Sequence, residues 1–187
     1  MKRKKPFFSI IVPTYNRPRQ LRSCLKALSS LDYPRNCFEV IVVDDGNDGN
    51  KVSMGPVVSS FKDRLDITLV RQWHGGPAAA RNTGAMRARG EFLAFTDDDC
   101  APESDWLQRL AARFIETSDQ AIGGKTINAL RGNRYSAASQ TVVDYLCQWY
   151  NTDPERARFS ASNNFAIPAQ GFHAIGGFDT TFTHAAG

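Results

Sequence analysis

The chain has 187 residues, of which 42% are hydrophobic and 22% charged, and it carries a formal net charge of +4. This size suits one globular domain with a full core. The sequence shows no apolar run near the roughly 20 residues that a membrane helix needs. The four cysteines are scattered without a CxxC pair, which argues against a zinc site and favours a reducing cytosol.

The first two thirds of the chain alternate between apolar runs and helical patterns. Four segments predict strands, of which Phe8–Pro13 and Phe38–Val43 are expected to be buried, and Asp66–Arg71 and Phe92–Thr96 are the third and fourth. Helical spacing of apolar residues lies between them, at Leu21–Leu31, weakly near Val57–Phe61, and at Ala78–Gly90, where Gly90 is the expected stop. This alternation predicts an α/β fold whose mostly parallel central sheet is flanked by helices on both faces.

The pattern weakens in the last third. Ser104 is a candidate cap for a helix with its core face at Leu107, Leu110, Ala111 and Phe114. The most polar and least regular stretch is Asn128–Arg158, which we expect to be a flap, although apolar spacing near Val142–Trp149 suggests a helix within it. Asn163–Pro168 predicts a late strand, and a short helix should lead to the turn at Gly176-Gly177.

Ligands of parallel sheets bind outside the carboxyl ends of the strands. The loops that follow the four strands should therefore carry the chemistry, and they are Pro13–Pro18, Asp44–Asp48, Trp73–Asn82 and Thr96–Cys100. The first of them has no glycine. A dinucleotide-binding dehydrogenase or a P-loop enzyme would need its glycine-rich phosphate loop at that place, so both classes are disfavoured.

Three adjacent carboxylates, Asp97, Asp98 and Asp99, end the fourth apolar run. Because like charges this close repel one another, the cluster is unfavourable unless it is neutralised. A hard divalent cation, which prefers oxygen ligands, would neutralise it. A helix N-cap with an acidic first turn would explain one or two of the three, and we favour the metal site. An EF-hand is excluded because the twelfth position counted from Asp97 is Gln108 rather than glutamate.

Two further loops carry candidate ligand groups. Asp44 and Asp45 close the second strand, where a carboxylate can accept hydrogen bonds from a base or ribose; turn chemistry at Asp45-Gly46 is the alternative. A response-regulator acidic pocket also uses such a pair, but normally after the first strand. Gly75-Gly76-Pro77 precedes a helix whose N-terminus can attract an anion. Arg81 in its first turns could contact an anion or base, or lie on the surface.

Five segments resemble family 2 glycosyltransferases, which have the GT-A fold of nucleotide-diphospho-sugar transferases. They are SIIVPTYNR, EVIVVDDG, GGPAAARNTGA, GEFLAFTDDDC and SNNFAIPAQGFHAIGGFD, in the order and spacing of the family, from Ser9 to Asp179. Each alone is a weak to moderate signal, and the five in order are a strong one.

The resemblance implies a role for particular residues. Donor binding would fall to Pro13 and Tyr15 at the nucleobase, Asp45 at the base and Arg81 at the base or phosphates, while Asp97 or Asp98 would reach the ribose or a water on the metal. The metal, Mn²⁺ or Mg²⁺, would be held on the diphosphate by Asp99 and Asp97, the DxD pair of the family. Asn163 and Asn164 would shape the acceptor-side sugar pocket. Phe178 is expected to pack in the core.

The family usually transfers the sugar with inversion, using a carboxylate base from an acidic ED pair shortly after the GGFD segment. This sequence ends at Gly187 without that pair, so we expect a single domain that is C-terminally incomplete, with its base beyond Gly187. Asp179 is expected to be structural, and His184 a surface residue. The expected parts are a basic tail at 1–7, a nucleotide-binding half at 8–100 and the start of the acceptor-side half at 101–187.

The expected partners are a nucleotide-sugar donor, with a UDP-sugar favoured, and a saccharide, lipid-linked or other hydroxyl acceptor. A nucleotide-sugar-binding module without turnover is the alternative, whereas a nucleotidyltransferase would need a glycine-rich first loop. No basic stripe suggests nucleic acid. We expect a cytoplasmic protein. Its tail, with Lys2, Arg3, Lys4 and Lys5, is either solvated, which we favour, or in peripheral contact with the anionic inner face of the membrane.

Overall fold

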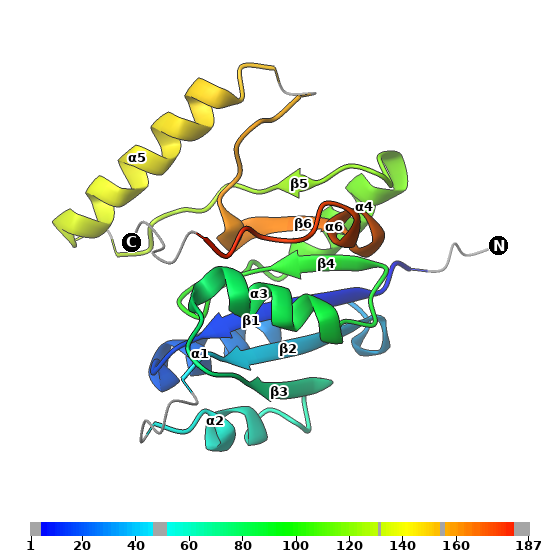
Figure 1. The fold of residues 1–187 in the computed structure, drawn as a ribbon, viewed down its shortest axis with the longest axis vertical. Coiled ribbons are helices and arrows are strands. Elements are labelled where there is room, and N and C mark those ends of the chain that lie inside the picture. The colour runs from blue at the N-terminus through cyan, green and yellow to red at the C-terminus, as the bar shows by residue number, and fades with distance from the viewer. Residues whose placement is uncertain (1–4, 47–51, 131, 154–155, 182–187) are drawn as a thin grey trace.

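The computed structural model describes residues 5–46, 52–130, 132–153 and 156–181. It has a six-stranded sheet with helices on both sides (Figure 1). In chain order the elements are β1 (Phe8–Thr14), α1 (Pro18–Leu28), η1 (Arg35–Cys37), β2 (Phe38–Asp44), α2 (Gly55–Ser59), β3 (Ile67–Arg71), α3 (Gly76–Arg87), β4 (Phe92–Phe95), α4 (Trp106–Glu116), β5 (Ile122–Gly123), α5 (Arg134–Tyr150), η2 (Ser162–Asn164), β6 (Phe165–Pro168) and α6 (Ala169–Ala174).

The strand order in the sheet is β3-β2-β1-β4-β6-β5. The first four strands in this order pair in parallel, whereas β6 runs antiparallel to both of its neighbours, β4 and β5. The predicted α/β fold with a mostly parallel sheet is therefore confirmed. Because β1, β2, β3 and β4 run the same way, their carboxyl ends meet at one edge of the sheet, where such folds bind ligands.

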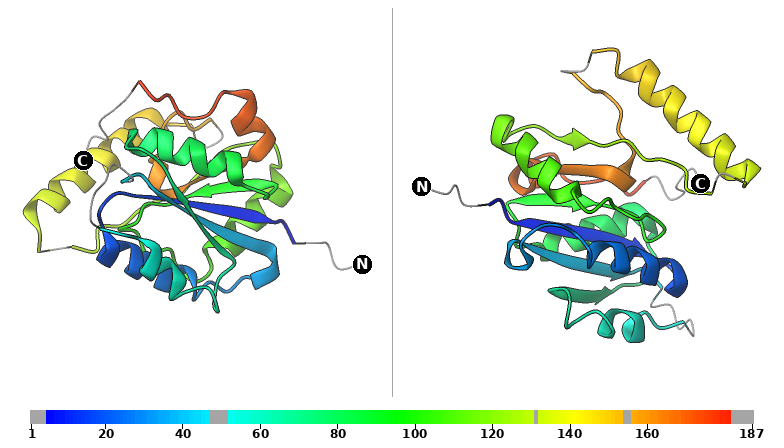
Figure 2. Two further views of the ribbon diagram at one scale, coloured as in Figure 1. Left: turned by 60° about the horizontal axis from the view of Figure 1, so that its bottom comes forward. Right: turned by 180° about the vertical axis from the view of Figure 1, so that it is seen from behind.

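The central strands are buried on both faces. Along β1, Ile10 and Val12 face the cluster packed under α1, α2 and α4, while Ile11 faces the cluster under α3 and α6. Figure 2 shows these two helical layers on opposite sides of the sheet. Strands covered on both faces read as continuous apolar runs, which is why the sequence marks them clearly.

Helix α3 lies unusually close to the sheet because its contact face is made of small residues. A methyl group added at Gly84 would lie 2.5 Å from Cγ2 of Ile11 and 3.2 Å from Cγ2 of Val43. Ala80 and Ala85 on the same helix are buried. The small residues thus let α3 pack closely against β1 and β2.

Two expected helix ends were wrong. Helix α3 stops at Arg87 rather than at Gly90, and Ala88 already has extended backbone. Gly90 is needed instead for a close approach, since a Cβ there would lie 2.5 Å from the Ser9 nitrogen, and its own N–H donates to Ser9 Oγ. Helix α4 has Asp105 at its N-cap position, not Ser104, and no side chain caps it.

Helix α5 stands apart from the sheet at the top of Figure 1. It contains the helix suggested near Val142–Trp149 but is much longer, with 17 residues, so the stretch expected to be least regular is largely helical. Asn133 caps it by accepting from the amides of Tyr135 and Ser136, and none of its residues is buried. Among the described residues, no helix combines the length and apolarity required to cross a membrane.

Candidate functional site

A cavity of about 260 Å³ lies at the carboxyl edge of the parallel strands. Its walls come from the ends of β1, β2 and β4 and from the first turns of α3. Seven of the nine site residues expected from the sequence line it, namely Pro13, Tyr15, Asp45, Arg81, Asp97, Asp98 and Asp99. The other two, Asn163 and Asn164, are not among its lining residues.

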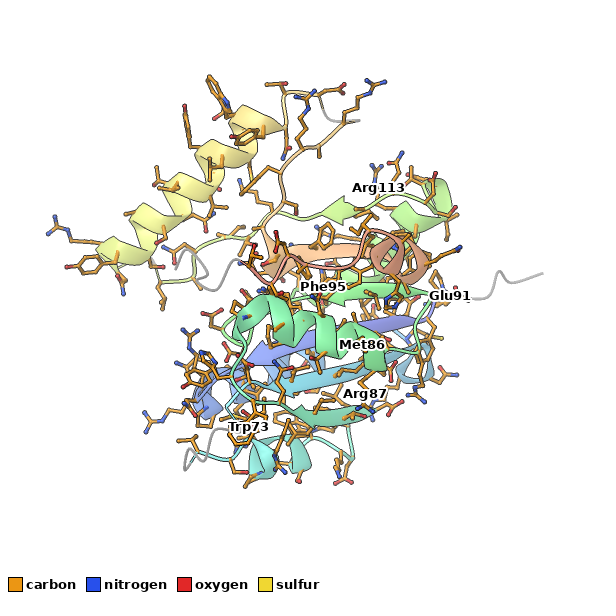
Figure 3. The ribbon with its side chains drawn as sticks, viewed as in Figure 1. Trp73, Met86, Arg87, Glu91, Phe95 and Arg113 are labelled. Carbon is orange, nitrogen blue, oxygen red and sulfur yellow. The ribbon has the colours of Figure 1, made fainter. Side chains whose placement is uncertain are left out.

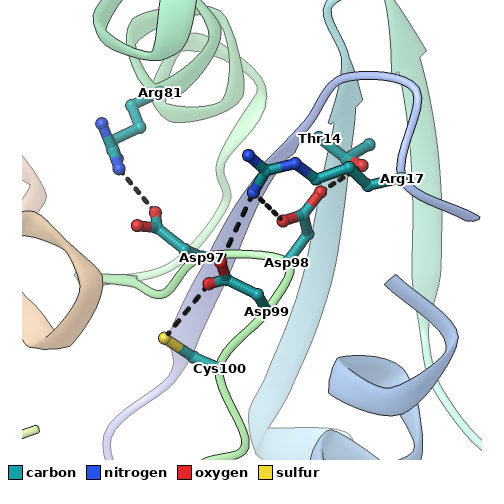
Figure 4. A network of polar contacts seen from close by, with 7 residues as sticks. All are labelled: Thr14, Arg17, Arg81, Asp97, Asp98, Asp99 and Cys100. Carbon is teal, nitrogen blue, oxygen red and sulfur yellow. Dashed lines mark hydrogen bonds and ion pairs between the residues drawn. The ribbon is translucent and has the colours of Figure 1, made fainter. Parts of the chain in front are cut away.

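The three consecutive aspartates point in different directions (Figure 4). Asp98 is turned inward and 4% exposed, and it accepts a 2.7 Å hydrogen bond from the Thr14 hydroxyl. The side chains of Asp97 and Asp99 are 32% and 53% exposed. Asp97 pairs with Arg81 at 2.5 Å, while Asp99 lies 3.4 Å from an Arg17 nitrogen. The two accessible carboxylates are thus the first and the third.

Burial sets the electrostatics of the middle aspartate. It raises the pKa of Asp98 to about 6, and the neighbouring carboxylates of Asp97 and Asp99 act in the same direction. The hydrogen bond from Thr14 and the charge of Arg17, 3.6 Å away, oppose the increase. Asp98 is therefore the most buried of the three carboxylates, and burial makes it costly to ionise.

The carboxylates offer oxygen atoms only, which suits Mg²⁺ or Mn²⁺ rather than a soft metal. Within the described part of the chain, no three acidic, histidine or cysteine side chains converge into a ready-made metal group. Asp97 is paired with Arg81 and Asp99 with Arg17, so the two carboxylates are held on different partners. Such a donor set fits a cation that arrives with a diphosphate, because these ions commonly take one or two carboxylates and complete their shell with phosphates and water.

Asp45 is buried and holds the loop that leads into α3. One of its oxygens accepts from Gln72 Nε2 at 2.7 Å and from the Gly75 amide at 2.9 Å. The other accepts from the Gly76 amide at 2.9 Å and lies 2.9 Å from His74 Nδ1. Its charge thus satisfies free N–H groups at the start of α3. The alternative of turn chemistry at Asp45-Gly46 is not what the Asp45 side chain does; Asp44 accepts from the Gly46 amide instead.

The rings of Tyr15 and His74 stack at the cavity wall, with centroids 4.4 Å apart and planes 30° from parallel. Sequence reasoning named Tyr15 but missed His74, since a histidine in a glycine-bearing loop carries no pattern of its own. Trp73 beside it lies on the outside and is 72% exposed (Figure 3). The aromatic wall of the cavity is therefore built from two loops that are far apart in sequence.

Arg81 is a buried cation at the cavity wall, with only 8% of its side chain exposed. The alternative of a surface arginine is therefore wrong. One terminal nitrogen bonds Asp97, whereas the Nε atom is buried and has no hydrogen-bond partner within the described part of the chain. A guanidinium held at the wall of a cavity is suited to an anionic or polar ligand.

Two further cavity residues, Thr14 and Arg17, were missed. Both belong to the glycine-free loop PTYNRP after β1. Arg17 contacts Asp98 and Asp99 across a separation of more than 80 residues. Charge pairing could have predicted the role of Arg17. It lies in the loop after β1, the acidic cluster lies in the loop after β4, and these two strands are neighbours in the sheet.

Asn163 and Asn164 serve as scaffold at the edge of the second half. The Asn164 amide accepts from Trp106 Nε1 at 3.0 Å and donates to the Lys125 carbonyl at 3.1 Å. Asn163 Oδ1 accepts from the Thr126 hydroxyl. These bonds tie η2, just before β6, to α4 and to the segment after β5. The assignment of both residues to a sugar pocket stays a prediction.

The fold and the cavity together define a class. A parallel sheet with a ligand site at its carboxyl edge, an antiparallel strand on the far side and paired carboxylates after β4 are the features of the GT-A fold. The sequence profile of glycosyl transferase family 2 matches residues 9–179. The chain belongs to this family.

Curated relatives carry glycosyltransferase names. Glycosyltransferase AglE of Haloferax volcanii is 38% identical over 119 residues, which make up 64% of this chain and 39% of AglE. The pre-mycofactocin glycosyltransferase of Mycobacterium tuberculosis is 27% identical over 180 residues, 92% of this chain and 36% of that protein. The chain thus spans about two fifths or less of the length of these two relatives.

Solved structures share the fold. The Staphylococcus aureus TarS 1–349 structure in complex with UDP superposes with a TM-score of 0.73 at 23% identity, covering 96% of this chain and 52% of that one. The mannosyltransferase PcManGT from Pyrobaculum calidifontis, in complex with GDP-Man and Mn²⁺, has a TM-score of 0.72 at 25% identity, covering 95% and 49%. The TarS complex with UDP-GlcNAc is 31% identical over 66% of this chain, with a TM-score of 0.59.

Proposed function

We propose that this chain is the donor-binding domain of a metal-dependent glycosyltransferase, which moves a sugar from a nucleotide diphosphate to an acceptor hydroxyl with inversion. The observation that carries the proposal is the cavity itself. It places an aromatic ring, a buried arginine and two accessible carboxylates within one space of about 260 Å³. A nucleotide sugar needs a stacking surface for its base and charge compensation for its diphosphate.

In this proposal the base lies against Tyr15 and Pro13, close to the Asp45 carboxylate. Tyr15 is 39% exposed, so a ring face remains available to a ligand. Arg81 contributes a fixed positive charge beside the ribose or phosphates, and its buried position means that little side-chain freedom is lost on binding. Asp98 orders the loop from beneath through Thr14.

Asp97 and Asp99 are the proposed metal ligands, on the basis of their exposure and oxygen chemistry. When bound, Mn²⁺ or Mg²⁺ would offset the negative charge that grows on the leaving diphosphate. The chain itself keeps the two carboxylates in place, since Arg81 holds Asp97 and Arg17 holds Asp99 until phosphate oxygens compete for the same groups.

The donor is proposed to be a UDP-sugar. The TarS structure with UDP-GlcNAc is 31% identical to this chain over 66% of its length, which supports uracil. PcManGT, at 25% identity, is bound to GDP-Man, and guanine is thus the natural competitor in any test.

The proposed division of labour keeps residues 8–100 for the donor and 101–187 for the acceptor, with Asn163 and Asn164 shaping the sugar pocket through the segments they tie together. Asp179 is poorly suited to act as the general base, because Thr181 donates two hydrogen bonds to it and lowers its pKa. His184 lies outside the described residues. A binding module without turnover therefore stands as the alternative function.

The test is a thermal-shift panel of UDP- and GDP-sugars, each with and without Mn²⁺. A ligand of the native state raises the unfolding midpoint, so a UDP-sugar with Mn²⁺ should give the largest shift. Asp99→Ala should remove the metal-dependent part, and Asp63→Ala, an exposed aspartate on another loop, should behave as the parent. No metal-dependent shift for any donor would refute the proposal. Binding without release of UDP in the presence of acceptors would favour the module.

A peripheral contact with an anionic membrane, at the cytoplasmic face, is proposed as a second feature. Most of the basic tail lies outside the described residues. Support comes from α5, whose outward stripe consists of Tyr135, Val142, Tyr145 and Trp149, each more than half exposed. The only acidic residue of this helix, Asp144, is turned away from the stripe and bonded by Gln140. Tyrosine and tryptophan prefer the interface of a membrane.

Next to this stripe, at the end of α5, lies a hollow of about 370 Å³. It is lined by Trp149, Tyr150, Thr152, Asp153, Arg156 and Arg158. Its arginines suit lipid phosphate. Flotation with vesicles containing phosphatidylglycerol should recover the parent and lose Trp149→Ser, while neutral vesicles should recover neither. Equal recovery of parent and variant would refute the contact.

A further inference from the structure

The turn Gly176–Asp179 is clasped by a side chain from α3, far away in sequence. The Asn82 amide donates to the Phe178 carbonyl at 2.8 Å, and its oxygen accepts from the Phe178 amide at 2.9 Å. A single asparagine thus satisfies both backbone groups of one residue 96 positions further along the chain.

The turn is shaped around this asparagine. Gly177 has a φ of +81°, a left-handed conformation that favours glycine. A Cβ at Gly177 would also lie 2.6 Å from Asn82 Oδ1, well inside van der Waals contact. The glycine is therefore required both for the turn and for the close approach of the Asn82 side chain.

The clasp fixes an aromatic ring beneath the cavity arginine. The Phe178 ring lies 5.6 Å from the guanidinium carbon of Arg81, within cation–π range. On its other sides the ring packs edge-on against Phe95, 5.1 Å away, and against Phe172 at 5.4 Å. The two Asn82 bonds fix the backbone of Phe178, and packing against Phe95 and Phe172 confines its ring, so the ring forms a support for Arg81, which reaches Asp97.

We propose that Asn82 is a positioning residue of the donor site: by fixing Phe178 it holds the Arg81 guanidinium in place at the cavity wall beside Asp97. The inference rests on the proposed function, since it assumes that Arg81 contacts a nucleotide diphosphate. It makes the turn after α6 a part of the donor site, although it contributes no atom to the cavity lining.

A purely structural role would give a different result, and the chain contains a matched control. Asn151 clasps another segment in the same way, donating to the Phe159 carbonyl at 2.8 Å and accepting from the Phe159 amide at 3.0 Å, and it accepts one further bond, from the Arg158 amide at 2.8 Å. It lies at the end of α5 and is not a lining residue of the donor cavity. Loss of this clasp removes the same chemistry without touching Arg81.

The experiment measures the affinity of UDP with Mn²⁺ by isothermal titration, together with the unfolding midpoint. Asn82→Ala should weaken UDP binding roughly tenfold, the scale of a buried cation–π support, and lower the midpoint. Asn151→Ala should lower the midpoint and leave the affinity unchanged. Phe178→Leu, which keeps both backbone bonds but removes the ring, should weaken binding to a similar extent.

Adding Asn82→Ala to Phe178→Leu should cause little further loss of affinity while still lowering the midpoint, because the effect on Arg81 passes through the ring. The inference would be overturned if the double variant lost affinity by the product of the two single losses. It would also be overturned if Asn82→Ala bound UDP as tightly as the parent. If Asn82→Ala does not fold, normal UDP affinity in Phe178→Leu overturns it equally. A parent that binds no nucleotide diphosphate refutes the proposed function instead.

Discussion

The two halves of the molecule differ in how their residues are buried. In the half that carries the cavity at the sheet edge, every residue of β1, β2 and β4 is buried, and small residues of α3 pack against the sheet. In the other half, α5 spans 17 residues and buries none of them. The cavity is therefore held by a packed core, whereas α5 is held mainly by its own backbone and a few polar contacts.

The largest contrast is expected from a charge placed in each half. Val42→Asp puts a carboxylate into a fully buried strand and should abolish folding, since an unpaired buried charge is among the most destabilising changes. Val142→Asp, on a side chain 58% exposed, should change the free energy of unfolding by less than about 0.5 kcal/mol. Urea denaturation followed by circular dichroism measures both. Strong destabilisation by Val142→Asp would show that α5 is covered in solution.

A methyl group added to a glycine gives the next contrast. Gly84→Ala would force Cβ to 2.5 Å from Ile11 and should destabilise the fold by about 1–3 kcal/mol through overpacking. Gly132→Ala has no atom within 4 Å and should be neutral. Thermal unfolding of the two variants tests the comparison, and a Gly84→Ala protein as stable as the parent would mean that α3 sits further from the sheet.

The buried carboxylate of the donor site predicts a dependence on pH. Folding raises the pKa of Asp98 from 3.8 to about 6, so the folded state binds this proton more tightly than the unfolded chain does. The resulting contribution to stability is fully present below about pH 4 and is lost as the pH rises through 6. Asp98→Asn should therefore stabilise the metal-free protein at pH 7.5, by about 1–3 kcal/mol, and give no gain near pH 4. Denaturation in EDTA at both pH values is the measurement; an equal difference at the two would contradict it.

The smallest effect should come from the cap of α5. Asn133→Ala removes the acceptor for two amides of the first turn, a loss of about 1 kcal/mol for the helix. Because α5 buries no residue, the loss should appear as faster amide exchange in this helix, with the global unfolding midpoint unchanged. A lower global midpoint would mean that α5 unfolds together with the sheet.

The half of the molecule with the cavity was predictable because strands buried on both faces have apolar residues at successive positions. Continuous apolar runs marked β1, β2 and β4, and the mixed run that became the partly exposed β3 was also predicted to be a strand. The rule that ligands bind beyond the carboxyl ends of the strands located seven cavity residues. The helix ends were less predictable. Gly90 looked like a helix stop, but its absence of a side chain serves contact with Ser9, which is a tertiary requirement.

What the sequence determined by itself was the class of fold, the family and the set of polar loops at the sheet edge, since these follow from periodicity and from residue types in order. The tertiary structure decided how those loops share their charges. Asp98 is turned inward to Thr14, Arg17 crosses to the acidic cluster, and Asn82 fixes the turn beneath Arg81. Contacts between residues about 80 or more positions apart leave no local pattern, because they depend on which side chains the folded sheet brings together.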